Sequence, residues 1–268
     1  MGREPIFNLP ALIPILIALF ILIELVIGYL GPEAASDIYL TFGFIPADLA
    51  DRFGSDVFRK LEEASRLKPD SEDLAGLAEI AAYLRMHPSA IPFSLISYGF
   101  LHAGWPHLII NSVWLMAFGS VVLRRIGTIR FLVLLALSSI GAALFHFATH
   151  SDGVMPVIGA SGAVSGIMAA AIRFVFQPGE SLSGFSLDAS GTYHAPALPL
   201  IKTFSDRRTL RFILLWLAIN IVTGFAGVPL GLGEGSIAWE AHVGGFITGL
   251  IVFSWVDPPM QDDPSVLN

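Results

Sequence analysis

The chain has 268 residues, of which 54% are apolar and only 14% are charged. This balance excludes an ordinary soluble domain and indicates several segments that cross a membrane. The formal net charge of −7 comes mainly from loops and the C-terminal tail, which argues against a nucleic-acid partner, and the absence of cysteine excludes disulfides, thiol catalysis and thiolate metal sites.

Six apolar segments predict an all-α, polytopic membrane protein in which residues 1–268 form a single domain. The first segment is longer than a signal-peptide core and lacks a clear cleavage site, so we expect a retained helix. The connections 124–130 and 173–211 carry Arg and Lys, whereas 149–160 and 229–237 carry none. The positive-inside rule therefore predicts that both termini are cytoplasmic. The predicted spans are about 8–30, 107–123, 130–148, 161–176, 209–228 and 238–256.

Residues 31–106 form an unusually long first extracytoplasmic loop. Leu49, Phe53, Val57 and Leu61 recur every four residues, which predicts one amphipathic helix lying along the outer interface. A second helix is expected to begin after Ser71, which would serve as its N-cap. The sequence leaves open whether this helical pair gates the membrane domain or is a solvated hairpin without a chemical role.

Isolated polar residues interrupt the second, third and fifth spans. His107 and Asn111 are four residues apart and share one face of the second span. His146 and His150 have the same spacing, which suits a metal ion, but no carboxylate in that helix completes a site. We therefore interpret these two histidines as interfacial residues and expect no metal. Asn220, in the fifth span, is interpreted as a packing contact.

Small residues mark the fourth and sixth spans. Gly162 and Gly166 form one Gly-x-x-x-Gly face, and Gly245 and Gly249 form another. Two such faces allow two helix backbones to approach closely. Ser161 lies in the first turn of the fourth span, where free N–H groups and the helix dipole favour an oxyanion.

With both termini inside, the second, fourth and sixth spans run in the same direction, so their polar residues lie at one depth near the outer face. His242 is then placed to act as the base that activates Ser161. The Ser161 N–H, the Asn111 amide and His107 are candidate oxyanion donors. Glu240 points to another side of its helix, so the prediction is a dyad in which another contact sets the histidine tautomer.

The ordered motifs resemble the rhomboid family of intramembrane serine proteases, over about residues 93–256. Each motif alone is weak, but the set in this order is specific. The matching elements are His102 through Asn111 with its His-x-x-x-Asn motif, Gly159-Ala160-Ser161-Gly162, and Ala241-His242-x-x-Gly245-x-x-x-Gly249.

The resemblance implies a six-helix rhomboid-like bundle that cleaves single-span membrane proteins within the lipid bilayer, near the outer end of the substrate helix. It implies a multi-pass protein of a bacterial inner membrane that needs no cofactor, and it leaves the oligomeric state open. By this resemblance Ser161 is the nucleophile and His242 the general base, and the oxyanion hole consists of Asn111, His107 and the Ser161 amide. The glycines expected to shape the site are Gly159, Gly162, Gly166, Gly245 and Gly249.

The sequence departs from the family pattern in three places. Phe93-Ser94 replaces a Trp-Arg pair in the first loop, and Leu123 lies where many members have a glutamate. Ser165 replaces the aromatic residue that usually packs on the catalytic histidine. The candidates to support His242 instead are Trp239, Phe246 and the Ser165 hydroxyl.

Two other classes of function are alternatives to the protease. One is a catalytically inactive rhomboid-like protein that binds membrane clients, although such proteins usually lose the serine or the histidine. The other is a small transporter or channel, which commonly carries intramembrane charges and an internal repeat. Apart from Glu24 in the first span and Glu240 at the start of the sixth, the predicted spans contain no acidic residue, and the two halves of the chain show no repeat.

Overall fold

A computed structural model describes residues 9–87, 91–177, 196–226 and 238–257. All named elements in this part of the chain are helices, and the only strand-like pairing there is an isolated bridge between Phe44 and Val157. The helices are α1 (Leu12–Leu30), α2 (Pro32–Phe42), α3 (Pro46–Arg52), α4 (Val57–Leu67), α5 (Glu72–Met86), α6 (Ser94–Ser97), α7 (Trp105–Trp114), α8 (Ser120–Thr149), α9 (Ser161–Val175), α10 (Leu200–Ser205), α11 (Arg207–Ala226) and α12 (Trp239–Val256), with a 3₁₀ turn η1 (Tyr98–Phe100) and a π-helical turn η2 (Leu115–Gly119).

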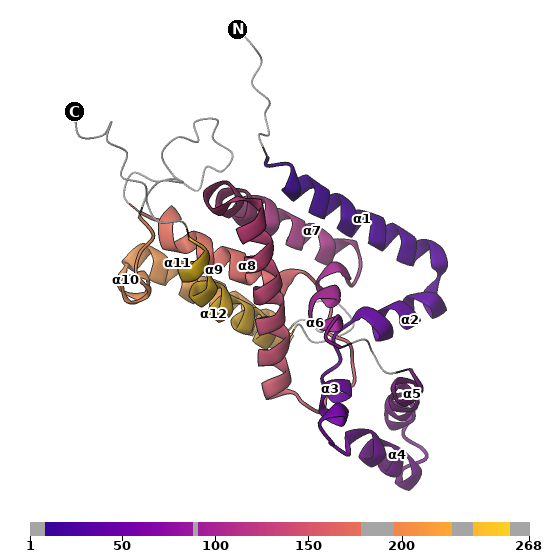
Figure 1. Ribbon diagram of the computed structural model, residues 1–268. Coiled ribbons are helices and arrows are strands. Elements are labelled where there is room, and N and C mark those ends of the chain that lie inside the picture. The colour runs from indigo at the N-terminus through magenta and orange to yellow at the C-terminus, as the bar shows by residue number, and fades with distance from the viewer. Residues whose placement is uncertain (1–8, 88–90, 178–195, 227–237, 258–268) are drawn as a thin grey trace, which may run out of the picture.

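Helix α9 is the centre of the molecule, with α8 and α12 packed along it (Figure 1). Every residue of α9 from Gly162 to Val175 is buried, although the helix has only 15 residues. Small side chains explain this burial, because Ala169, Ala170 and Ala171 let the neighbouring helices approach the α9 backbone. The large apolar residues Ile167 and Phe174 fill the space between them.

Among the residues that the structure describes, three helical stretches are long and apolar enough to cross a membrane: Leu12–Leu30, Trp105–Thr149 and Trp239–Val256. Apolar side chains also face outward on two outer helices. Ile15 and Leu22 are exposed on α1, and Leu215 and Ile219 are exposed on α11. Helices that bury one face and expose another apolar face suit a lipid environment.

The connection between the second and third predicted spans is shorter than the expected one at 124–130. Helix α7 continues through η2 into α8, and the helical backbone is interrupted only at Gly127, where φ is +76°. A left-handed backbone conformation favours glycine because this residue has no Cβ. Arg124 and Arg125 therefore remain helical, and the reversal is concentrated at one residue.

The prediction of a single amphipathic helix across Leu49 and Val57 is wrong. Gly54 adopts φ of +84° after α3, and the next helix, α4, begins at Val57. Leu49 packs beside Tyr98, whereas Val57 packs in a separate cluster with Leu84. The four-residue spacing thus came from two short helices that face different cores. The loop also contains α2, α6 and η1, so its helices number more than the two predicted.

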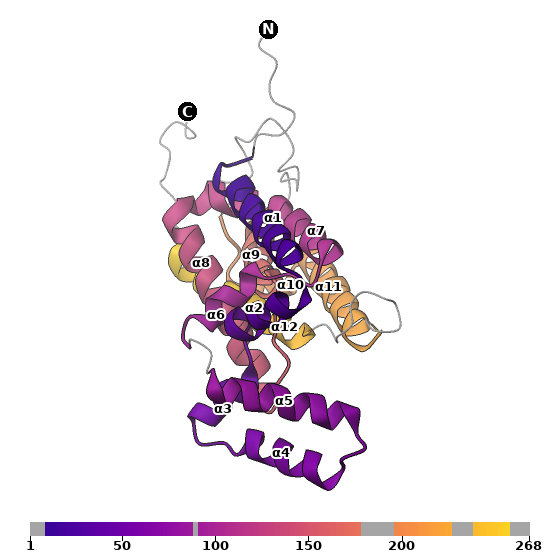
Figure 2. The same cartoon turned by 90° about the vertical axis from the view of Figure 1, so that its right-hand side faces the viewer.

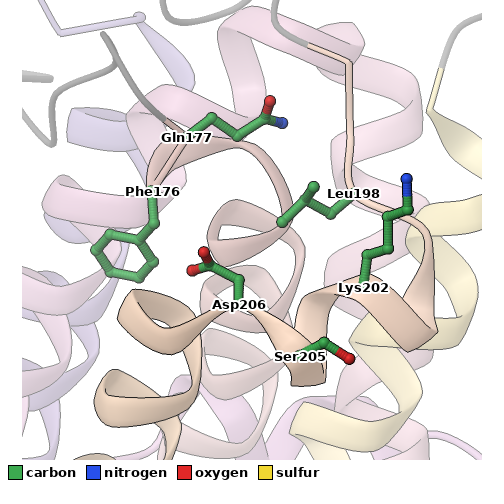
Figure 3. A pocket seen from close by; sticks show the side chains of 6 residues that line it. All are labelled: Phe176, Gln177, Leu198, Lys202, Ser205 and Asp206. Atoms are coloured by element: carbon green, nitrogen blue, oxygen red, sulfur yellow. The ribbon is translucent and has the colours of Figure 1, made fainter.

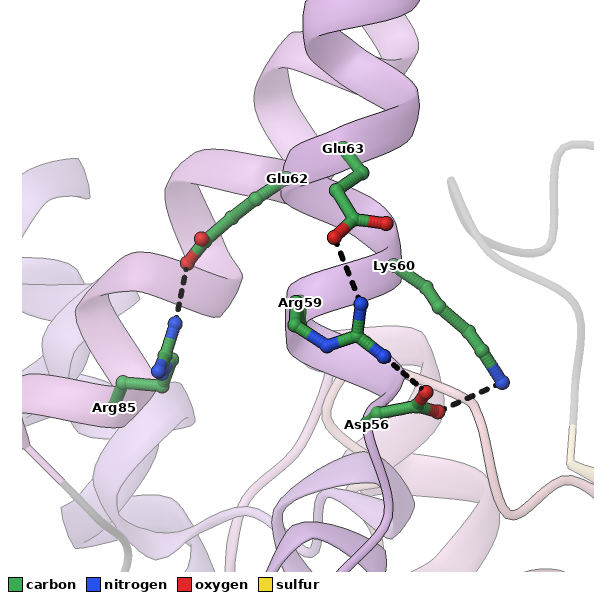
Figure 4. A network of polar contacts seen from close by, with 6 residues as sticks. All are labelled: Asp56, Arg59, Lys60, Glu62, Glu63 and Arg85. Atoms are coloured by element: carbon green, nitrogen blue, oxygen red, sulfur yellow. Dashed lines mark hydrogen bonds and ion pairs between the residues drawn. The ribbon is translucent and has the colours of Figure 1, made fainter.

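Helices α4 and α5 form a hairpin that projects from the bundle (Figure 2). The Ser71 Oγ accepts a hydrogen bond from the Leu74 N–H at 3.4 Å and caps α5. Arg85 on α5 donates to Glu62 on α4 at 2.9 Å, at one edge of an exposed charge network (Figure 4). Exposed ion pairs add little stability, so we attribute the pairing of the two helices mainly to their apolar contacts.

A buried ion pair joins α8 to the end of α12. Arg125 donates to both carboxylate oxygens of Asp257, at 2.6 and 2.9 Å, and its guanidinium lies 4.5 Å from the centre of the Phe174 ring. On α9, Arg173 donates to the Leu250 carbonyl at 3.2 Å and to the Ser254 hydroxyl at 2.7 Å. These contacts fix the ends of α8, α9 and α12 that are remote from Ser161.

Candidate active site

The structure brings Ser161 and His242 together, although they are 81 positions apart in the chain. Ser161 is the first residue of α9, and His242 lies in the first turn of α12. The Ser161 Oγ lies 2.7 Å from the His242 Nε2, which is hydrogen-bonding distance. A serine hydroxyl and an imidazole in this arrangement can exchange a proton directly.

Glycines allow α9 and α12 to come this close. A Cβ atom at Gly245 would overlap the Gly162 carbonyl, and one at Gly249 would overlap the Gly166 carbonyl. In the other direction, a Cβ at Gly166 would lie 2.8 Å from the Gly245 carbonyl oxygen. These neighbours are backbone atoms and cannot rotate aside. The two Gly-x-x-x-Gly faces are therefore in direct contact, and a larger residue there must separate the helices.

Asn220 is the partner of the other His242 ring nitrogen, so its interpretation as a mere packing contact is wrong. The Asn220 Oδ1 and the His242 Nδ1 form a hydrogen bond between α11 and α12. The Asn220 side chain is itself anchored, because its Nδ2 donates to the Trp216 carbonyl at 2.7 Å. The sequence signal was an amide inside an apolar span, which is costly unless the amide is paired.

These two hydrogen bonds assign a tautomer to His242. Because the Asn220 Nδ2 is the donor to Trp216, its Oδ1 is available only as an acceptor. The neutral imidazole then carries its proton on Nδ1, and Nε2 presents a lone pair to the Ser161 hydroxyl. A base in a Ser–His pair requires this tautomer.

His107 and Asn111 lie one turn apart on α7, and the His107 ring lies near Ser161. The Ala103 N–H donates to the His107 Nδ1 at 3.3 Å, which leaves the Nε2–H of a neutral ring as a donor. The buried Asn111 amide donates to the His107 carbonyl at 3.1 Å and has a second N–H to offer. Both predicted oxyanion donors therefore retain a hydrogen-bond donor.

Gly159 separates His107 from the serine. Its backbone φ is +118°, and a Cβ atom there would lie 2.8 Å from the His107 Nε2 and 3.6 Å from the Ser161 Oγ. The absence of a side chain at Gly159 thus leaves room between the serine oxygen and the imidazole N–H. A carbonyl oxygen of a substrate requires such room beside both groups.

His102, in the turn before α7, packs against the ring of His107. The two imidazole rings meet edge to face, with centroids 5.3 Å apart, and Phe20 of α1 lies 5.0 Å from His102 on another side. Burial, together with the neighbouring His107, lowers the pKa of His102 to about 4. His102 is therefore a neutral packing residue at physiological pH.

The three residues expected to support His242 in place of an aromatic ring have other contacts. Ser165 donates its hydroxyl proton to the Ser161 carbonyl at 2.7 Å, within α9. Phe246 stacks on Trp216, with centroids 4.7 Å apart, and the Trp239 ring lies against Gly224. Ser165 therefore cannot donate the same proton to His242. Asn220 is the hydrogen-bond partner that the sequence did not identify.

The other two departures from the family pattern lie away from the serine. Phe93 packs edge to face on Phe42, with centroids 6.3 Å apart, and Ser94 beside it is buried. Leu123 is buried in the main apolar core of the bundle. Leu123 is therefore held by apolar contacts, whereas the Oγ of Ser94, at the position of the family's arginine, makes no hydrogen bond within the described part of the chain.

A pocket lies near the opposite end of α9 from Ser161, between the end of that helix and α10 (Figure 3). None of its lining residues belongs to the predicted site: they are Phe176, Gln177, Leu198, Lys202, Ser205 and Asp206. A helix of 15 residues is about 22 Å long, so this pocket is far from the Ser161 hydroxyl.

The described helices form an apolar bundle in which a serine and a histidine share a hydrogen bond across a glycine-lined contact. Such a bundle is typical of an integral membrane protein with a serine-histidine site. The chain belongs to the rhomboid family, because the model of the rhomboid domain matches residues 91–257. The family resemblance predicted from the ordered motifs is thereby confirmed.

Relatives of the chain include rhomboid proteases. It is 30% identical over 164 residues to the rhomboid protease GlpG of Yersinia pseudotuberculosis. The aligned region covers 60% of this chain and 46% of that protein. It is 30% identical over 166 residues to the rhomboid protease GlpG of Yersinia pestis, with the same coverage of 60% and 46%. RHOMBOID-like protein 5 of Arabidopsis thaliana is 25% identical over 205 residues, or 76% of this chain and 56% of that protein. The chain thus spans about half the length of these relatives.

Proposed function

We propose that this chain is an intramembrane serine protease in which Ser161 is the nucleophile and His242 the general base. The observation that carries the proposal is the 2.7 Å contact between the Ser161 Oγ and the His242 Nε2 at adjoining helix starts. Two named rhomboid proteases among the relatives support the same reaction class. Hydrolysis of a peptide bond by a Ser–His pair requires no cofactor.

The reaction begins when His242 takes the Ser161 hydroxyl proton on Nε2 while the serine oxygen attacks the substrate carbonyl. The tetrahedral intermediate collapses, and the same nitrogen gives its proton to the leaving amine. Water, deprotonated by His242, then hydrolyses the acyl-enzyme and regenerates both groups. Asn220 keeps the Nδ1 proton in place throughout, and its Oδ1 stabilises the imidazolium as that ion forms.

The oxyanion hole consists of His107, Asn111 and the Ser161 backbone N–H. The Ser161 N–H lies at the start of α9, where helix N–H groups have no partner inside the helix. The His107 Nε2–H faces the space that Gly159 leaves beside the serine. Each such donor lowers the transition-state energy by about 3 kcal/mol in well-studied hydrolases.

The membrane arrangement completes the proposal. The chain spans the membrane six times. The second span consists of α7 and the first part of α8, and the third is the remainder of α8; the other four spans are α1, α9, α11 and α12. Both termini are cytoplasmic, the site lies near the outer face of a bacterial inner membrane, and the substrates are single-span membrane proteins. Because α9 is only about 22 Å long, Ser161 lies below the outer surface of a 30 Å hydrocarbon core.

Cleavage of a membrane-anchored reporter tests this function. The parent chain should cleave the reporter, and Ser161→Ala should abolish cleavage while the protein still reaches the membrane. Ser205→Ala is the matched control, because Ser205 is exposed at the remote end of the molecule and, among the described residues, its hydroxyl donates to the Ile201 carbonyl of its own helix. Equal cleavage by Ser161→Ala and the parent would end the assignment. Capture of membrane clients without cleavage would favour the non-catalytic, client-binding alternative.

A further inference from the structure

Three potential metal ligands converge beside the outer end of α8. Glu240 on α12 lies between two histidines of α8: its Oε2 is 3.8 Å from the His146 Nδ1, and its Oε1 is 3.8 Å from the His150 Nε2. All three ligand atoms lie within 4.8 Å of one another. Glu240 thus points away from Ser161, as its helix position predicts, and supplies the carboxylate that α8 itself lacks.

The two histidines are arranged in parallel. They lie one helical turn apart, and their rings stack with centroids 4.9 Å apart and an interplanar angle of 11°. This arrangement presents one nitrogen of each ring toward the same side of α8. Two histidines at this spacing are a common way for one helix to supply two ligands to a metal ion.

Hydrogen bonds of Thr149 prepare the His150 ring for a ligand. The Thr149 hydroxyl donates to the His146 carbonyl at 2.9 Å, so its oxygen can accept from the His150 Nδ1–H at 3.0 Å. The His150 Nε2, which faces Glu240, then carries a lone pair. A metal-binding imidazole typically has its other nitrogen held in this way.

Glu240 is largely buried, so its carboxylate requires a positively charged partner. The side chains of Glu240 and His146 are only 13% and 12% exposed, and the His146 Nδ1 makes no hydrogen bond within the described part of the chain. A carboxylate removed from water is stable only if it is paired or coordinates a cation. His150 is 49% exposed and gives an ion in solution access to the site.

We propose that His146, His150 and Glu240 bind a divalent transition-metal ion of the Zn²⁺ type. Two imidazoles and one carboxylate suit zinc, and a fourth position remains for water. Metal–ligand bonds of about 2.0–2.1 Å place tetrahedral ligand atoms roughly 3.3 Å apart, so side-chain rotations must shorten the two His–Glu240 separations of 3.8 Å and bring all three atoms, now within 4.8 Å of one another, closer together. The bound ion would fasten the outer end of α8 to the first turn of α12, which carries His242 two residues after Glu240.

Co²⁺ binding to the full-length protein tests the site, because tetrahedrally bound Co²⁺ absorbs visible light. The protein is purified in detergent without a polyhistidine tag and titrated with Co²⁺ and then with Zn²⁺. The expected result is one Co²⁺ per chain, with its absorption bands abolished by Zn²⁺. Glu240→Gln and His150→Ala should each weaken Co²⁺ binding at least tenfold. Zn²⁺ should raise the Tm of the parent but not of these variants, because ligands that bind only the folded state stabilise it.

His87→Ala is the matched control, because His87 is an exposed histidine that contacts Tyr83 instead of the cluster. It should bind Co²⁺ as the parent does. The proposal is overturned if the parent gives no tetrahedral Co²⁺ spectrum, or if both cluster variants bind as tightly as the parent. If Glu240→Gln does not fold, as judged by circular dichroism, the half-exposed His150→Ala variant decides. None of these measurements depends on proteolysis, so the outcome is independent of the proposed enzymatic function.

Discussion

Replacing Asn220 with alanine tests whether the amide sets the tautomer of His242. The variant removes the Oδ1 acceptor of the His242 Nδ1 but leaves the Ser161–His242 contact untouched. Without this acceptor, the neutral ring can move its proton to Nε2. In that tautomer the nitrogen that faces Ser161 is a donor and cannot take the serine proton.

The size of the effect follows from the hydrogen bond that is lost. Asn220 is buried, and it is held by its own bond to the Trp216 carbonyl, so its orientation needs little reorganisation. Loss of one partner of a buried hydrogen bond costs about 1–3 kcal/mol. At about 1.4 kcal/mol per factor of ten, we expect the reactivity of Ser161 to fall roughly 5- to 150-fold.

The rate of Ser161 labelling by a fluorophosphonate measures this effect without a substrate helix. Asn220→Ala should lower the second-order rate constant, whereas the melting temperature in detergent should fall only modestly. Thr223→Ala is the matched control on the same helix, because the Thr223 hydroxyl bonds to the backbone carbonyls of Ile219 and Asn220 in its own helix. A labelling rate in Asn220→Ala within twofold of the parent would refute the role of Asn220 in setting the tautomer.

Three further substitutions test other parts of the structure. Gly245→Ala should lower the Tm and reduce fluorophosphonate labelling at least tenfold, because the new Cβ overlaps the Gly162 carbonyl. The control Gly76→Ala places its Cβ in open space and should be neutral or slightly stabilising. Asp257→Ala should lower the free energy of unfolding by about 2–3 kcal/mol, measured by denaturant titration in detergent micelles, because buried Arg125 loses its carboxylate; an unchanged midpoint would contradict this. Ser71→Ala should cost about 0.5 kcal/mol and speed hydrogen exchange at the start of α5 without changing the labelling rate.

The proposed catalytic pair could be predicted because the sequence evidence for each residue is local. Ser161 lies in a run of small residues, and His242 precedes a second glycine repeat at the same predicted membrane depth. Only close helix packing explains glycines at those intervals in apolar segments, and such packing brings the two residues together. The rhomboid motifs therefore carried both the family and the positions of the pair.

Residues that act across helices were harder to predict. An asparagine in an apolar span can bond to any neighbour, so its sequence could not indicate that Asn220 meets His242. Glu240 was correctly expected to point away from the serine, but only the packing of α12 on α8 reveals the two histidines opposite it. Single-helix periodicity contains no information about which helices are neighbours.

The loop at residues 31–106 also shows that a periodic pattern of apolar residues need not form one continuous helix. Leu49 and Val57 fit one helical repeat. In the structure, however, the chain turns at Gly54 after α3, and the two residues pack in different apolar clusters. A glycine inside an amphipathic pattern is compatible with a continuous helix at a cost of about 1 kcal/mol. The tertiary contacts of the two short helices outweigh that local preference.

The most direct measurement of the central claim is peptide mapping by mass spectrometry after fluorophosphonate treatment of the folded protein. We predict a single modified residue, Ser161, in the parent and at most a trace of modification in His242→Ala, which removes the Nε2 acceptor at 2.7 Å. Equal modification of Ser161 in both proteins, or an unmodified Ser161 in folded parent protein, would contradict activation of this serine by His242.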